Sequence, residues 1–308
     1  MSERIDPVPY EPEAFLADLR QAAEAIGAPF DEAMVRRTLE VFDAELRRCV
    51  VQLKATSRPG DGLYYRFFYK WERDLTEVAR QAGILPPAAP PLLELQPQLL
   101  AGLPGSTRAG LDLDAGFGIA KIWTFTGGPV PVEALARYPA VPDSVRTHLP
   151  FFARHGLKHV FFTASDLQRN SMNVYFILEE DCRHEAWLRA LVADTGGADA
   201  SAEDYQRMVE SLAVSAGVGF TFRWDQPELG RWCLYALNVE PGAAPLPDLP
   251  PRLARFPAQA PTLNEDPQFN VAWSFGPARF YVKLEKSYAR DADHFLTYEM
   301  GGDLSHLA

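Results

Sequence analysis

The stretch YVKLEKSY, from Tyr281 to Tyr288, predicts a β-strand with two unlike faces. Side chains alternate across a strand, so every second residue shares a face. One face carries Tyr281, Lys283, Glu285 and Ser287, and the other carries Val282, Leu284, Lys286 and Tyr288. An aromatic ring, a cation and a carboxylate in a row are more typical of a lined cavity than of a solvated surface.

The composition is that of a globular protein, with 308 residues, 47% hydrophobic and 23% charged. The net charge of -11 disfavours nucleic acid as a partner, because binding it needs a basic surface. The sequence has three scattered cysteines, Cys49, Cys182 and Cys233, which show neither the pattern of a disulfide framework nor the spacing of a zinc site. Free cysteines of this kind favour a reducing compartment. The N-terminus is polar and proline-rich, and no apolar run approaches the roughly 18 residues of a membrane span. We therefore expect a cytoplasmic protein without membrane contact.

The rest of the chain repeats one pattern, in which helical segments precede a hairpin of two strands. Helices are expected at 11–27, 31–46, 74–82, 91–103, 132–137, 142–155, 184–193, 202–212, 250–256 and 291–300. Strands are expected at 48–57, 63–70, 110–114, 119–125, 158–165, 171–178, 216–224, 231–238, 269–275 and 279–288.

These segments form about five units of roughly 45 to 60 residues each, which indicates an internal repeat. Hairpins are antiparallel, and a sheet of this size with helices on one face can close into a barrel without edges. We therefore predict an α+β fold: a ten-stranded antiparallel closed barrel surrounded by helices, built from five αα-ββ repeats in a single domain over residues 1–308. An open sheet or two domains is the alternative.

The other predicted strands repeat the unlike faces. Ile119, Lys121 and Trp123 share one face, for example, and Arg231, Cys233 and Tyr235 share another. If all mixed faces point inward, the barrel contains Lys54, Arg66, Lys121, Asn173, Arg231 and Lys283. Unpaired buried charges are very costly, so the simplest partner is a polyanion such as a diphosphate. The alternative is that each cation is solvated on the surface.

Motifs for other chemistries are missing. The sequence contains no DDxxD motif, no GxSxG elbow and no histidine pair with metal-ligand spacing. The segment GLPGST, at Gly102–Thr107, lacks the lysine of a phosphate-binding loop. We expect neither a metal site nor a cofactor.

Several stretches resemble one known family. They are TSRPGDGLYYRFF (Thr56–Phe68), AKIW (Ala120–Trp123), NVYF (Asn173–Phe176), RWCLYAL (Arg231–Leu237) and WSFG with YVKLEKSY (Trp273–Tyr288). In these residues the chain resembles the soluble aromatic prenyltransferases with the ABBA (αββα) barrel. It is most similar to the branch with the aminocoumarin-pathway enzyme for 4-hydroxyphenylpyruvate and the phenazine prenyltransferases. The resemblance implies transfer of an allyl group from an isoprenyl diphosphate to an electron-rich aromatic, in secondary metabolism such as antibiotic biosynthesis. It also implies a monomer.

The resemblance also implies roles for the donor site. Lys121, Asn173, Arg231 and Lys283 fall on the family's diphosphate-binding positions, and Lys54 adds to them. Trp123 and Tyr175, with Phe68, correspond to the aromatic shield around the allyl cation. Arg66 stands where magnesium-dependent members have an aspartate, so activity without magnesium is expected. A magnesium-dependent geranyltransferase and a non-catalytic barrel that binds an aromatic or isoprenoid ligand are the alternatives.

For the acceptor site, Glu285 is the candidate catalytic residue, which orients or deprotonates the acceptor unless it only forms a salt bridge with Lys283 or Arg231. Tyr235 and Glu285 replace small residues of geranyl-using relatives and favour dimethylallyl diphosphate. Phe161 stands where the hydroxyphenylpyruvate enzyme has an arginine. The loss of this arginine disfavours 4-hydroxyphenylpyruvate and favours a flat acceptor such as a dihydrophenazine carboxylate. The acceptor pocket is expected to contain Phe161, Gly217, Gly219, Cys233, Tyr235, Trp273 and Ser287.

Overall fold

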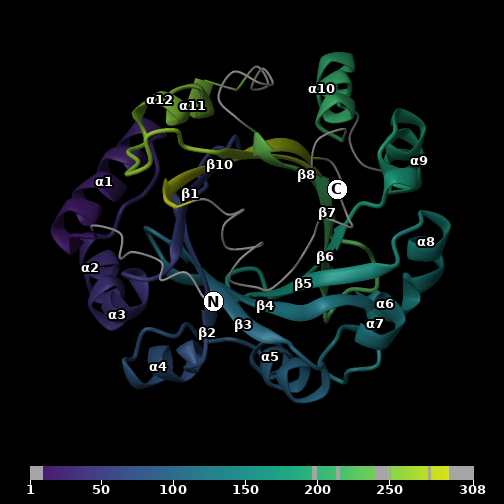
Figure 1. The fold of residues 1–308 in the computed structure, drawn as a ribbon, viewed down its shortest axis with the longest axis horizontal. Helices are drawn as coiled ribbons and strands as arrows, with labels where there is room; N and C mark the ends of the chain where they lie inside the picture. The colour runs from purple at the N-terminus through teal and green to yellow at the C-terminus, as the bar shows by residue number, and fades with distance from the viewer. Residues whose placement is uncertain are drawn as a thin grey trace, which may run out of the picture.

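The sheet of the protein closes into a barrel. The structure is a computed structural model that describes residues 10–195, 200–212, 216–239, 249, 251–276 and 279–290. Its strands are antiparallel to their neighbours in the order β1-β10-β9-β8-β7-β6-β5-β4-β3-β2, and helices surround them (Figure 1). The strands are β1 (Val50–Thr56), β2 (Tyr64–Trp71), β3 (Thr107–Asp114), β4 (Gly118–Pro131), β5 (His159–Asp166), β6 (Ser171–Ile177), β7 (Ala216–Arg223), β8 (Arg231–Val239), β9 (Phe269–Gly276) and β10 (Arg279–Ala289).

Short helices precede each hairpin, which confirms the predicted αα-ββ repeat. They are α1 (Pro12–Ala25), α2 (Glu32–Val41), α3 (Asp43–Leu46), α4 (Leu75–Gln81), α5 (Pro90–Gly102), α6 (Val132–Leu135), α7 (Asp143–Thr147), α8 (Leu149–Arg154), the 3-10 turn η1 (Glu180–Cys182), α9 (Glu185–Thr195), α10 (Ala202–Leu212), α11 (Pro251–Ala254) and α12 (Phe256–Gln259). The expected helices at 31–46 and 142–155 are each two helices, and the one expected at 291–300 lies outside the described residues. Within the described residues, no helix is long and apolar enough to cross a bilayer.

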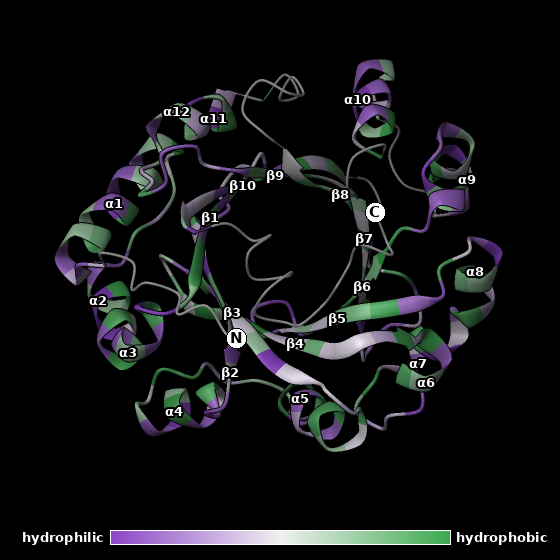
Figure 2. Ribbon diagram, viewed as in Figure 1, coloured by the Kyte–Doolittle hydropathy of each residue, from purple (hydrophilic) through white to green (hydrophobic). Residues whose placement is uncertain are grey.

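The outer helices follow from amphipathic sequence and from capping. In α1, Phe15, Leu16 and Leu19 are buried on one side, and Figure 2 shows both hydrophobic and hydrophilic residues on the surrounding helices. Asp31 accepts a hydrogen bond from the backbone N–H of Met34 and so caps the first turn of α2. The helices therefore turn an apolar face to the barrel and a polar face to water.

Two separate hydrophobic clusters show that the barrel has an outer and an inner packed face. The large cluster lies between strands and helices and includes Leu53, Val282 and Leu284. The small cluster consists of inward residues of neighbouring strands: Val50, Ala109, Trp123, Phe125 and Ala164, with Phe68, Phe162 and Tyr175 packed against them. The inner face also carries polar and charged residues, such as Lys121, Asn173 and Lys283, as the mixed faces predict.

Register shifts correct two details of the predicted alternation. Between β3 and β4 the pairing shifts at Asp112/Leu113, so Ile119 packs in the outer cluster and not on the face of Lys121. Between β5 and β6 it shifts at Val160/Phe162. Phe161 and Phe162 consequently both line the barrel interior, although they are neighbours in sequence.

The prediction for Trp273 is wrong. This residue pairs with Val282 and Leu234, and it packs with them in the outer cluster. The inward residues of β9 are the alternating ones, Asn270 and Ala272, which face Glu285 and Lys283 across the strand pair. Trp273 therefore belongs to the packing between barrel and helices and not to an acceptor pocket.

Candidate active site

Two adjoining cavities occupy the barrel interior. A polar cavity of about 30 Å³ lies toward the end where the strand hairpins turn, and a larger aromatic cavity of about 120 Å³ lies next to it. Arg66, Tyr175, Tyr235 and Glu285 line both cavities. Any two molecules bound in them would thus meet at these four side chains.

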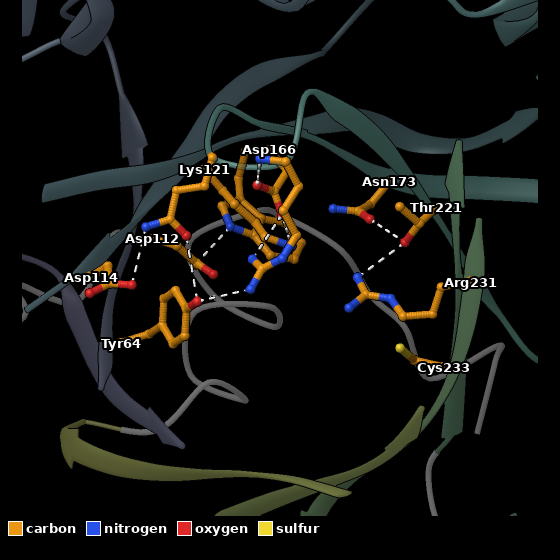
Figure 3. Close-up of polar contacts among 12 residues, drawn as sticks. Tyr64, Asp112, Asp114, Lys121, Asp166, Asn173, Thr221, Arg231 and Cys233 are labelled. Atoms are coloured by element: carbon orange, nitrogen blue, oxygen red, sulfur yellow. Dashed lines mark hydrogen bonds and ion pairs between the residues drawn. The ribbon is translucent and has the colours of Figure 1, made fainter. Parts of the chain in front are cut away.

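The polar cavity is built by alternation on several strands. Figure 3 shows Lys121, Asp166, Asn173, Thr221 and Arg231, which come from β4 to β8 and project into the barrel. The remaining cations and hydroxyls come from β1, β2, β10 and the hairpin turns: Lys54, Arg58, Tyr64, Arg66, Arg169, Tyr281 and Lys283. Positive charge is thus concentrated inside a protein whose net charge is -11.

Asp112 neutralises part of this charge. Its carboxylate, on β3, accepts hydrogen bonds from Lys54 Nζ at 2.5 Å, Arg66 Nε at 2.5 Å and Trp123 Nε1 at 2.8 Å. Burial alone would raise the pKa of Asp112, but Arg66 and Lys54 outweigh burial and hold it well below its usual range. Burial lowers the pKa of Lys54, whereas Asp112 and Glu285 raise that of Arg66. Arg66 therefore keeps its positive charge beside Asp112 more readily than Lys54 does.

Lys121 has its own buried carboxylate. Its Nζ lies 3.2 Å from Asp166 Oδ2, and Arg169 Nη1 lies 3.5 Å from the same oxygen. Burial lowers the pKa of Lys121 to about 7, even though Asp166 opposes this shift. Lys121 is consequently only partly charged near neutral pH, and an additional anion would complete its protonation.

Arg231 and Lys283, in contrast, contact hydroxyl and thiol groups and, among the described residues, no carboxylate. Arg231 donates to the Tyr281 hydroxyl and, at 3.1 Å, to Thr221 Oγ1. Lys283 Nζ contacts Cys233 Sγ at 3.0 Å and Tyr235 OH at 3.3 Å. Across the described residues, neither cation forms an ion pair with a carboxylate, so both retain charge for a bound anion.

Cys233 responds to these two cations. Burial alone would raise the pKa of its thiol, but Lys283 and Arg231 outweigh burial and lower the pKa to about 6. A thiolate therefore balances the cations at neutral pH when no other anion is bound.

Asn173 is oriented by Thr221, whose hydroxyl donates a hydrogen bond to Asn173 Oδ1 at 2.6 Å (Figure 3). Asn173 Nδ2 is buried without a hydrogen-bond acceptor among the described residues.

Aromatic rings form the boundary between the cavities. Trp123 and Tyr175 are stacked with ring centroids 4.8 Å apart, and Phe68 meets Trp123 edge-on at 5.6 Å. The Arg66 guanidinium lies 4.6 Å from the Trp123 ring centroid, so this ring already faces a cation. Gly219 permits the arrangement, since a Cβ there would lie 2.8 Å from a ring carbon of Tyr175.

The aromatic cavity has one apolar and one polar wall. The apolar wall comes from β5 to β8 and includes Phe161, Phe162, Ile177, Gly217 and Leu237. The polar wall comes from β1, β2, β9 and β10 and consists of Gln52, Arg66, Asn270 and Glu285. Glu285 Oε2 accepts from Arg66 Nη1 at 3.1 Å and Asn270 Nδ2 at 3.3 Å. The salt bridge expected for Glu285 thus exists, but its partner is Arg66, not Lys283 or Arg231.

Comparison with known proteins identifies the family. The family model described as aromatic prenyltransferase Orf2 matches residues 10–298. The chain belongs to this family of aromatic prenyltransferases. It is 34% identical over 292 residues to a 4-hydroxyphenylpyruvate 3-dimethylallyltransferase of Streptomyces niveus, covering 94% of this chain and 88% of the relative. It is 32% identical over 285 residues to an aromatic prenyltransferase of Sclerotinia sclerotiorum, covering 92% of each chain.

Solved structures support the same fold. AnaPT from Neosartorya fischeri superposes with a TM-score of 0.58 at 12% identity, covering 96% of this chain and 97% of its own. A 6-dimethylallyl tryptophan synthase superposes with a TM-score of 0.57 at 13% identity, covering 90% and 96%. These likenesses confirm the barrel expected from the sequence.

The prenyltransferase barrel brings together most of the predicted site residues. Three groups of predicted residues line the cavities: the polar cavity alone has Lys54, Lys121, Arg231 and Lys283, the aromatic one alone has Phe68, Trp123, Phe161 and Gly217, and both have Arg66, Tyr175, Tyr235 and Glu285. Cys233 contacts Lys283, and Asn173 is linked to Arg231 through the Thr221 hydroxyl. Gly219 lies where a Cβ would meet the rings of Tyr175 and Tyr235. Ser287 pairs with Gln52 on the inner face but is fully covered, and Trp273 lies outside the barrel.

Sequence reasoning missed the buried carboxylates Asp112 and Asp166, and the rim residues Arg58, Asp61 and Arg169. Asp61 accepts hydrogen bonds from Arg58 and lies 3.4 Å from Arg169, so it links two cations at the cavity mouth. The available signal was alternation in 107–114, which places Asp112 on the inner face opposite Lys121. The rim residues lie in turns, where alternation gives no prediction.

Proposed function

We propose that this prenyltransferase moves a dimethylallyl group from dimethylallyl diphosphate to a ring carbon of an electron-rich aromatic acceptor, without a metal ion. The supporting observation is a cavity in which Arg231 and Lys283 have no carboxylate partner among the described residues. This cavity adjoins an aromatic cavity at Tyr175 and Tyr235. A relative that is 34% identical is named as a dimethylallyltransferase, which supports this donor.

The first step breaks the bond between the allylic carbon and the diphosphate oxygen, and the electron pair leaves with the diphosphate. Arg231, Lys283 and Lys121 would stabilise the charge that develops on the leaving group in a site shielded from water. Binding of the diphosphate would also displace the negative charge from Cys233, because both anions compete for Lys283.

The allylic cation would then lie against Tyr175 and Trp123. Each aromatic face contributes about 0.5–2 kcal/mol to a bound cation. Arg66 already lies near Trp123, but Asp112 and Glu285 hold and neutralise its guanidinium. Tyr175, which lines both cavities, is accordingly the principal contact we assign to the allylic cation.

The acceptor ring would attack the cation from the aromatic cavity, forming a carbon–carbon bond, and the ring carbon would then lose its proton. Glu285 lies between the cavities and has one oxygen, Oε1, without a hydrogen-bond partner among the described residues. This oxygen is positioned to accept either the ring proton or a hydrogen bond from the acceptor.

The cavity dimensions support a short donor. The rings of Tyr175 and Tyr235 lie 6.0 Å apart, centroid to centroid, and line both cavities, so they would obstruct a longer isoprenyl chain that passes from one cavity into the other. Metal independence is supported by the charge at the polar cavity, since Arg231, Lys283, Arg58 and Arg169 line it together. We further propose a single-domain, monomeric, cytoplasmic enzyme of secondary metabolism, whose monomeric state size-exclusion chromatography with light scattering would test.

The test is an acceptor screen with labelled dimethylallyl diphosphate in EDTA, read by mass spectrometry over phenols, indoles and dihydrophenazines. We expect transfer by the wild type, loss of transfer in Lys283→Ala and retention in Lys286→Ala. Lys286 is a matched control because its ammonium points outward to the carbonyls of Pro257 and Ala260. Strong stimulation by magnesium with geranyl diphosphate would favour a geranyltransferase instead. Ligand binding without turnover, insensitive to Lys283→Ala, would favour a non-catalytic barrel.

A further inference from the structure

An arginine outside the barrel binds the turn between β1 and β2, which lies at the mouth of the polar cavity. Arg252, on α11, donates through Nη1 to the backbone carbonyls of Thr56 and Arg58, at 2.8 and 2.5 Å. It donates through Nη2 to the carbonyl of Asp61, and through Nε to the carbonyl of Ile26 at the C-terminal end of α1. One guanidinium thus joins the β1–β2 turn to two of the surrounding helices.

The helix that carries Arg252 is firmly packed, whereas the tip of the turn is exposed. Leu253, the next residue, is fully buried in the outer cluster, and so is Phe256 at the start of α12 (Figure 1 shows both helices outside the barrel). Pro59 and Gly60, at the tip of the turn, are exposed. Hydrogen bonds from a charged donor are stronger than those between neutral groups, so we expect Arg252 to hold the turn against the packed helix.

The turn carries two side chains that separate the polar cavity from the surface. Arg58 and Asp61, together with Tyr281, line both the polar cavity and an outer hollow of about 630 Å³. Arg58 donates to Asp61 through Nε at 3.0 Å and through Nη2 at 2.6 Å, so the two charges neutralise each other. The guanidinium carbon of Arg58 lies 4.5 Å from the ring centroid of Tyr281, which fixes one side of this ring.

Tyr281 connects the turn to the proposed donor site. Its hydroxyl accepts a hydrogen bond from Arg231, one of the two cations that we assign to the diphosphate. If the β1–β2 turn moved, the Arg58 guanidinium would leave the Tyr281 ring, and the hydroxyl that holds Arg231 would move with the ring. This matters because a planar guanidinium binds phosphate oxygens only in a defined orientation.

We infer that Arg252 is a positioning residue for donor binding. It holds the β1–β2 turn, and through Arg58 and Tyr281 it orients Arg231. The inference rests on the proposed function and assigns a role to a residue that lines neither cavity. An arginine that only stabilised the fold would change the melting temperature without a specific effect on diphosphate binding.

The experiment measures the affinity of each variant for inorganic pyrophosphate by calorimetry. The variants are Arg252→Ala, Arg252→Lys, Arg58→Ala and the double variant Arg58→Ala/Arg252→Ala. The matched control is Arg146→Ala. Arg146, on α7, also donates to two backbone carbonyls, those of Val141 at 3.0 Å and Tyr138 at 2.8 Å, but these residues line neither cavity.

We expect Arg252→Ala to bind pyrophosphate about tenfold more weakly than the wild type, the usual effect of losing one charge-assisted contact, and Arg146→Ala to stay within about twofold. Arg252→Lys keeps the charge but lacks the planar fork, so it should still bind at least about threefold more weakly. Because Arg252 acts through Arg58, the double variant should bind within about twofold of Arg58→Ala. A merely structural role would not produce this non-additivity.

Wild-type affinity in Arg252→Ala or Arg252→Lys, or an equal loss in Arg146→Ala, would overturn the inference while the proposed function stands. Effects of the Arg58 and Arg252 substitutions that simply add would overturn it as well. A thermal unfolding scan shows whether Arg252→Ala is folded, and if it is not, the comparison of Arg252→Lys with the wild type decides. Wild-type protein that binds neither pyrophosphate nor dimethylallyl diphosphate would contradict the proposed function itself.

Discussion

The buried carboxylate of Asp112 should be essential for stability. Asp112→Asn preserves the shape of the side chain and an oxygen for Trp123 Nε1, but removes the negative charge shared by Lys54 and Arg66. Glu285 then remains as the carboxylate in contact with Arg66, and the new amide presents N–H groups to other donors. Removal of one partner from a buried ion pair costs about 3–5 kcal/mol, and we expect a loss of this size in the free energy of unfolding.

The assay is urea denaturation followed by tryptophan fluorescence, with Asp143→Asn as control. The Asp143 side chain is 94% exposed and pairs with Arg146 on the surface, so its replacement should change stability by no more than about 0.5 kcal/mol. Addition of inorganic pyrophosphate should partly restore Asp112→Asn, because it supplies negative charge to the same cavity. A loss below about 1 kcal/mol, similar to that of the control, would refute the conclusion that Asp112 balances the buried cations.

Other predictions follow from the same geometry. Because the pKa of Cys233 is lowered to about 6, its thiolate forms as the pH rises above this value and competes for Lys283. The affinity for pyrophosphate, measured by calorimetry, should therefore fall above pH 6 by up to about tenfold per pH unit. In Cys233→Ser the affinity should fall less steeply. Gly219→Ala should lower kcat about tenfold or more without unfolding the protein, because the new Cβ displaces Tyr175; unchanged kcat would show that the ring position is unimportant. Tyr235→Ala should admit geranyl diphosphate, and a donor preference that stays with dimethylallyl diphosphate would contradict the proposed chain-length limit. Trp273→Phe should lower the melting temperature but leave the KM for the acceptor unchanged, because Trp273 packs between barrel and helices. A large change in this KM would show that Trp273 contacts the acceptor after all.

The sequence predicted the barrel because period-two alternation and the repeat of helices before each hairpin are local patterns. Lys283 and Glu285 were placed correctly on the inner face, since β10 keeps a regular register with β9 from Arg279 to Lys286. Ile119 was not, because a register shift in the pairing with β3 depends on the neighbouring strand and leaves no mark in the residue pattern of β4 alone.

The balance of buried charge was harder to predict. Alternation gave the cations, and it suggested that a diphosphate was their main partner. The structure instead pairs Lys54, Arg66 and Lys121 with protein carboxylates on β3, β5 and β10. These pairs form between strands that are adjacent or one strand apart in the barrel, and they include residues distant in sequence, such as Arg66 and Glu285, which are 219 positions apart. Closure of the sheet determines such contacts, and no local pattern specifies them.

The central claim is that the donor diphosphate binds among Arg231 and Lys283 while its allyl group reaches the aromatic boundary. A crystal structure with dimethylallyl S-thiolodiphosphate, an unreactive donor analogue, tests it most directly. We predict that diphosphate oxygens lie within hydrogen-bond distance of Arg231 and Lys283, with the dimethylallyl group against Tyr175 and Trp123. A diphosphate bound in the aromatic cavity beside Phe161, or outside the barrel, would contradict the claim.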